Sequence, residues 1–252
     1  MNKALHSWIR FSLLNLLFVS VLGVLMRYKI AYSLPVLHQK FLLHAHSHFA
    51  FSGWITQAIM VLIVGYLCRY DEFALRKYRP LLIANAITAY GMLLSFPFTG
   101  YAAVSITFST LNIFTGYWFA VKLWRQLGRM PGNGVSHHWF RAAVVFNVIS
   151  SFGAFFLAYM MATRNIHQNW YLASVYFFLH FQYNGWFFFG CMGLLADLLK
   201  ERGVNMQFNK KVFWLFALAC IPAYFLSALW LPIPMAVYIL VVISAVAQVI
   251  AA

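Results

Sequence analysis

Acidic residues are nearly missing from this 252-residue sequence, which contains 4 Asp and Glu residues against 18 Lys and Arg. Charged residues make up 9% of the chain, whereas soluble domains carry about a quarter, so the composition excludes a soluble protein. The lack of carboxylates also disfavours carboxylate-rich metal sites and proton-coupled transporters, which use buried carboxylates. Cysteine is scarce as well: Cys68, Cys191 and Cys220 lie in apolar stretches without CxxC spacing, which predicts buried thiols and no disulfide framework.

Hydrophobic residues make up 63% of the chain and aromatic residues 19%. A membrane-spanning helix needs about 20 mostly apolar residues. Stretches of this kind are predicted at approximately 8–28, 41–68, 79–99, 101–124, 139–163, 170–198, 211–230 and 233–252. The sequence therefore predicts an all-α, polytopic membrane bundle of about eight transmembrane helices, as one domain over residues 1–252. We expect no internal repeat among them.

The net charge of +14 comes from basic residues that are unevenly distributed between the predicted loops. If the N-terminus is cytoplasmic, 14 of the 18 lie on the cytoplasmic side: Lys3, Arg10, Arg69, Arg76, Lys77, Arg79, Lys122, Arg125, Arg129, Arg141, Lys200, Arg202, Lys210 and Lys211. The others, on the outside, are Arg27, Lys29, Lys40 and Arg164. The positive-inside rule predicts a cytoplasmic N-terminus. We expect a multi-pass protein of the bacterial inner membrane. The basic excess predicts contact with anionic lipids of the bilayer, not with nucleic acid.

Three histidines, His44, His46 and His48, lie within two turns near the outer end of the second span. Imidazole is costly in hydrocarbon without a partner, and histidine is the commonest metal ligand. His44 and His48 are four residues apart and share a helix face, whereas His46 points away from both. Either His44 and His48 form a bidentate metal-binding pair, or His46 acts alone. The alternative is that some of them only hydrogen-bond to neighbouring helices.

A second constellation lies in the sixth span, where His180, Tyr183 and Asn184 share a helix face by their spacing. His180 is roughly 15 Å past the start of the span, a depth from the outer face close to that of His48. We therefore expect both histidines to reach one cofactor. The alternative is an interhelical hydrogen-bond network that serves packing.

The stretch Ala45-His46-Ser47-His48, followed by aromatic residues and Gly53-Trp54, resembles the second helix of haem–copper oxidase subunit I and its NnrS-type relatives. The resemblance implies a haem with His46 as axial ligand and His48 as the next candidate. His180 and Tyr183 are similar to the family's His-Tyr pair at the copper site, at a spacing one residue shorter. The resemblance implies haem, or copper, held by these histidines and His44, with a redox donor or other membrane subunits as partners.

The sequence departs from that family in the seventh span, where residues 212–230 contain no histidine and the oxidases carry a pair. The family also has twelve helices, with further haem ligands on the tenth. An oxygen-reducing centre is therefore not expected. The resemblance implies a haem-binding relative that transfers electrons or handles nitric oxide or oxygen, and an oxidoreductase if it is an enzyme.

The last span ends at Ala252 without the charged or aromatic residues that usually anchor a span at the interface. We therefore favour the interpretation that residues 1–252 are the N-terminal part of a longer, twelve-helix protein over that of a plain final helix.

Two other functions stay open. His44-x-x-x-His48 and His137-His138 are typical of membrane di-iron hydroxylases and desaturases, although the charge rule places the two sets on opposite membrane faces. A transporter, channel or accessory subunit, in which the histidines serve helix packing, is the other alternative.

The remaining histidines lie near the ends of the predicted spans. We expect His137 and His138 to be interfacial, and His6, His38 and His167 to be solvated.

Overall fold

A computed structural model describes residues 3–130, 134–204 and 209–251, and every regular element in these ranges is helical, as predicted. Among the described residues, six helices are long and apolar enough to cross a membrane: Lys3–Ala31, Gln39–Leu67, Ala74–Thr99, Ala103–Arg129, Ser136–Ala162 and Lys210–Ala228. Met235–Ala251 is also apolar but shorter, at 17 residues. By length and composition, the protein is an all-α, multi-pass integral membrane protein whose surroundings are a lipid bilayer.

The predicted sixth span, 170–198, is helical but is not among these six helices. Its centre contains His180, Gln182 and Asn184, and these polar side chains lower its hydropathy. All eight predicted stretches coincide with helices in the described ranges. The number of crossings stays a prediction.

The chain divides into two compact units, Met1–Lys122 and Leu123–Ala252. This division does not test whether residues 1–252 form one domain, so the single domain stays a prediction. The first unit contains α1 (Lys3–Ala31), α2 (Gln39–Phe49), η1 (Ala50–Thr56), α3 (Gln57–Leu67), α4 (Ala74–Thr99) and most of α5 (Ala103–Arg129). The second contains α6 (Val135–Ala162), α7 (Gln168–His180), η2 (Phe181–Phe187), α8 (Phe188–Glu201), α9 (Asn209–Ala223), η3 (Tyr224–Ala228) and α10 (Met235–Ala251).

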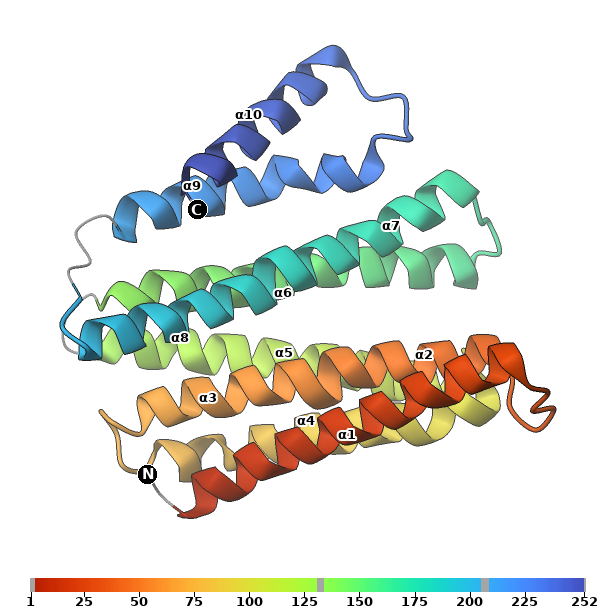
Figure 1. The fold of residues 1–252 in the computed structure, drawn as a ribbon, viewed down its shortest axis with the longest axis horizontal. Coiled ribbons are helices and arrows are strands. Elements are labelled where there is room, and N and C mark those ends of the chain that lie inside the picture. Colours follow the sequence, from red (N-terminus) through yellow and green to blue (C-terminus); the bar gives the residue numbers. More distant parts are fainter. Residues whose placement is uncertain (1–2, 131–133, 205–208, 252) are drawn as a thin grey trace. The chain divides into compact units, whose positions relative to one another are not determined.

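In the first unit, α2, η1 and α3 form one continuous rod that packs beside α1 and α4 (Figure 1). The core between these helices is apolar: Leu22 of α1, Leu42 and Ala45 of α2, and Met92 and Phe96 of α4 are buried together. This packing fixes which face of α2 meets α1 and which meets α4. It therefore decides where the three histidines of α2 point.

In the second unit, α7, η2 and α8 form the equivalent rod and pack along α6, while α9 packs against α10 (Figure 1). Cys220 of α9 is buried, as predicted, and Cys68 of the first unit is partly buried. The prediction that Cys191 is buried is wrong, because its side chain is exposed on α8. Apolar sequence does not imply burial in a membrane helix, because lipid accepts apolar side chains as readily as a protein core does.

The two units have the same order of elements: a long helix, a rod interrupted by a π-helical turn, and two further helices. Residues 48–54 read HFAFSGW and residues 180–186 read HFQYNGW, an offset of 132 positions. The same offset relates Asn15 to Asn147, and it relates η1 to η2 within one residue. We interpret these correspondences as an internal repeat, which we did not expect from the sequence. The identical residues are few, and only the equivalent π-helical turns make their correspondence evident.

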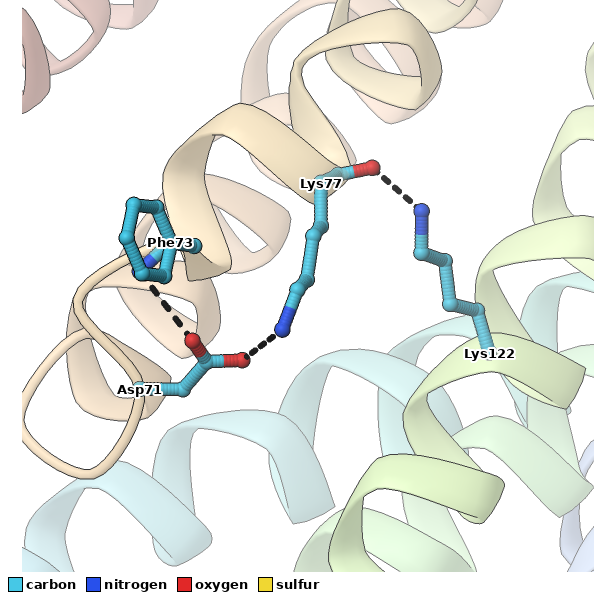
Figure 2. Close-up of polar contacts among 4 residues, drawn as sticks. All are labelled: Asp71, Phe73, Lys77 and Lys122. Carbon is cyan, nitrogen blue, oxygen red and sulfur yellow. Dashed lines mark hydrogen bonds and ion pairs between the residues drawn. The ribbon is translucent and has the colours of Figure 1, made fainter.

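The turn between α3 and α4 is held by polar contacts that Figure 2 shows. The Asp71 carboxylate accepts a hydrogen bond from the Phe73 backbone N–H (3.1 Å) and pairs with Lys77 Nζ (2.6 Å). Lys122 of α5 donates to the Lys77 carbonyl. One of the few acidic residues thus orders the start of α4, and that start is bonded to the end of the first unit.

α6 approaches α7 closely at Gly153. A methyl group added there would lie 2.5 Å from the Ser174 carbonyl oxygen of α7. Neither backbone can move away without opening the helix pair. We expect Gly153→Ala to lower the stability by about 1–3 kcal/mol, seen as a lower midpoint of thermal unfolding in detergent. Gly128→Ala is the matched control, since nothing lies within 4 Å of its added methyl group. Equal midpoints for the two variants would contradict the close α6–α7 approach.

Candidate functional site

The histidines of α2 point in two directions, as their spacing predicts. His46 contacts α1, whereas His44 and His48 lie against Phe96 of α4. The three imidazoles therefore belong to two sites on opposite faces of one helix. Two residues after His48, at Ala50, the rod changes to the π-helical turn η1. Turns of this kind are rare and occur frequently at functional sites.

His46 makes one bond that defines its ring chemistry. Its Nδ1 lies 3.1 Å from the backbone carbonyl oxygen of Val19 on α1. Because a carbonyl oxygen only accepts, Nδ1 carries the proton, and Nε2 keeps its lone pair. A methyl group at Gly23 would lie 3.4 Å from His46 Cε1, so the ring packs directly against the α1 backbone. An imidazole fixed in this way is oriented to offer Nε2 as a metal ligand.

His44 and His48 both contact Tyr101, which follows the end of α4. His48 Nε2 lies 3.0 Å from the Tyr101 hydroxyl, and the His44 ring meets the Tyr101 ring edge to face at 4.5 Å. Phe96 stacks on His48 at 4.5 Å. Sequence reasoning missed Tyr101, because its place beside α2 depends on how α4 ends.

The π-helical turn η1 is surrounded by amide side chains. Ser52 and Gly53 have carbonyl oxygens that accept hydrogen bonds from Asn85 Nδ2 (3.0 Å) and Asn15 Nδ2 (2.5 Å). Asn85 also donates to Gln57 Oε1 at 2.7 Å, and all three amide side chains are buried. Asn15 was not singled out in the sequence. Its repeat partner Asn147 is the signal that could have found it.

His180 has both ring nitrogens bonded within the second unit. Nε2 lies 2.8 Å from the Cys220 carbonyl oxygen, so Nε2 carries the proton and donates. Asn184 Nδ2 donates to Nδ1 across 3.1 Å. No lone pair is left for a metal in this arrangement, which favours the alternative of a packing network.

Asn184 and Cys220 occupy both nitrogens of His180, and the role that the resemblance implies for Tyr183 stays a prediction. Tyr183 is half exposed, and its ring meets Phe187 edge to face at 5.8 Å. The neighbouring Gln182 is buried and donates to Asn147 Oδ1 (2.8 Å) and to Ser150 Oγ (2.7 Å) of α6. Gln182 and Tyr183 both belong to the π-helical turn η2, in which Asn184 keeps the i, i+4 contact with His180 that the sequence predicts.

The remaining histidines lie at helix ends. His6, His38 and His167 are exposed, as predicted for solvated residues. His137 is buried and His138 is half-buried beside Phe213. Within residues 3–130, 134–204 and 209–251, the structure holds no group of three or more His, Cys, Asp or Glu side chains placed to share a metal ion.

Comparisons with protein-family models, with curated proteins and with solved structures find no match for this chain. The function must therefore be argued from the histidines and their partners.

The His180 network yields a prediction about stability. His180→Ala leaves the Cys220 carbonyl oxygen without its side-chain donor in the buried interior, so we expect a loss of about 1–3 kcal/mol in the free energy of unfolding. The measurement is the thermal midpoint in detergent. His167→Ala, an exposed histidine at the start of α7, is the control and should leave the midpoint unchanged. A midpoint unaffected by His180→Ala would show that the network contributes nothing.

Proposed function

We propose that the protein is a multi-pass membrane haem protein in which His46 is an axial ligand. The observation that carries this proposal is the bond from His46 Nδ1–H to the Val19 carbonyl oxygen at 3.1 Å. This bond fixes the tautomer, leaves the Nε2 lone pair for iron, and raises the basicity of the ring. The resemblance to the second helix of haem–copper oxidase subunit I points to the same residue.

A haem held there supplies either a one-electron carrier or a binding site for nitric oxide or oxygen. The chain's own contribution is orientation: Val19 fixes the proton position, and the contact with Gly23 sets the ring against α1. A redox donor or another membrane subunit would be the partner for electron transfer. His180 is not part of this proposal, because both of its nitrogens are bonded to Cys220 and Asn184.

A transporter or an accessory membrane subunit is the second candidate function. The observation that favours it is that the buried side chains of His180 and Asn85 form hydrogen bonds within the protein. Such bonds join neighbouring helices and serve packing. In such a protein, His46 would serve to join α1 to α2.

We also infer that all eight helical stretches cross the bacterial inner membrane, with the N-terminus in the cytoplasm. The support is the distribution of basic residues, 14 on one side against 4 on the other. The ion pair of Asp71 with Lys77 and the bond from Lys122 lie at the cytoplasmic end in this topology.

The haem proposal predicts that protein expressed with an ample haem supply shows a Soret absorption band after purification. His46→Ala should abolish the band, because it removes the proposed iron ligand, whereas His38→Ala, an exposed histidine just before α2, should retain it. Imidazole added to His46→Gly should restore the band. Wild-type protein without a Soret band, or full retention in His46→Ala, would remove the proposal.

The topology predicts where reporter enzymes are active. Alkaline phosphatase, which is active only outside the cytoplasm, should be active when fused after Val36 in the α1–α2 loop and after Ile166 in the α6–α7 loop. Green fluorescent protein fused after Glu72, between α3 and α4, should fluoresce, because it folds in the cytoplasm. The reverse pattern would overturn the assigned orientation.

A further inference from the structure

The face of α2 opposite His46 carries a cluster that the proposed haem does not use. It consists of His44, His48 and Tyr101, with Phe96 as its apolar wall. His44 Nε2 is buried and has no hydrogen-bond partner in the part of the chain that the structure describes. A buried ring nitrogen without a partner is destabilising, so a ligand that fills its lone pair would stabilise the protein.

The geometry fits a small cation that prefers nitrogen. His44 and His48 are four residues apart on one helical face, with Cβ atoms about 5–6 Å apart at this spacing, and such a pair can chelate one ion. The Tyr101 hydroxyl lies 3.0 Å from His48 Nε2 and would be the third donor. When the ion binds, His48 exchanges this hydrogen bond for the ion, and Tyr101 turns its oxygen to the same centre.

Tyr101 is held in place by a rigid turn. Gly100 ends α4 with φ of +58°, a value that favours glycine, and its carbonyl accepts a hydrogen bond from Ser105 Oγ at 2.5 Å. The Ala102 N–H donates to the same hydroxyl at 3.0 Å, and Ser105 is fully buried. The backbone that carries Tyr101 is therefore ordered before any ligand arrives, which lowers the entropy cost of binding.

The ligand set selects the class of ion. Two imidazoles and a phenol suit Zn²⁺, Ni²⁺ and above all Cu²⁺, which has the highest affinity among divalent first-row ions. Calcium and magnesium require several oxygen ligands, and the cluster contains one. Lys40, one turn before His44, repels a cation, but it is exposed and its charge is screened by solvent.

We propose that His44, His48 and Tyr101 form a transition-metal site, with copper as the preferred ion, on the face of α2 opposite His46. In the second unit, the positions equivalent to His44 and His48 are Tyr176 and His180. There His180 is bonded to Cys220 and Asn184. The proposed metal site therefore belongs to the first unit alone, and it does not depend on the haem proposal.

The test is a titration of chelator-treated full-length protein, purified in detergent without a polyhistidine tag, with Cu²⁺ and separately with Zn²⁺. We expect one tight Cu²⁺ per chain and nitrogen hyperfine splitting from two imidazoles in its electron paramagnetic resonance spectrum. His44→Gln and His48→Gln should each weaken Cu²⁺ binding at least tenfold, and Tyr101→Phe by a smaller factor. These variants keep side-chain size, so a folded sample can be verified by its thermal midpoint.

The controls separate this site from the others. His46→Ala should retain Cu²⁺ even where it loses haem, and His167→Ala should bind as the wild type does. Wild-type protein without tight Cu²⁺ would overturn the proposal. Unchanged affinity in folded His44→Gln would overturn it as well, because the metal would then sit on other histidines.

Discussion

Hydrocarbon offers no hydrogen bonds, so each polar group inside the bilayer must find its partner within the protein. The π-helical turns η1 and η2 each interrupt the regular α-helical pattern of a rod. Asn85 and Asn15 donate hydrogen bonds to the carbonyl oxygens of Ser52 and Gly53 in η1. In the second unit, the Cys220 thiol contacts the Asn184 carbonyl at 3.5 Å. In each unit these bonds join the interrupted rod to its neighbouring helices.

The same requirement gives the histidines different chemistry. His180 meets it completely, because both of its ring nitrogens are bonded to protein partners. His46 meets it with one bond to Val19 and keeps a lone pair. His44 has a buried nitrogen that lacks a partner among the described residues. The capacity to bind a metal therefore follows from what each ring nitrogen contacts, and the depth of the residue in the span does not predict it.

The two equivalent segments have similar sequences, yet their histidines have different partners. His48 and His180 occupy equivalent places before a π-helical turn, with the same Phe, Gly and Trp after them. In the first unit, the turn at Gly100 brings a phenol to His48. In the second, the last turn of α9 brings the Cys220 carbonyl to His180. The element that packs beside the rod, and not the motif, decides the partner.

Composition and apolar length alone determined that this chain is helical and crosses a membrane, because the bilayer permits few other structures for so apolar a chain. The i, i+4 spacing also placed His44 and His48 opposite His46 without any tertiary information. The tertiary structure decided which ring nitrogens are protonated, bonded or left without a partner. The partners are far away in sequence: the backbone carbonyls of Val19 and Cys220, and the hydroxyl of Tyr101. Only the packed helices bring these groups together, since hydrogen bonds depend on distances that spacing within one helix does not contain.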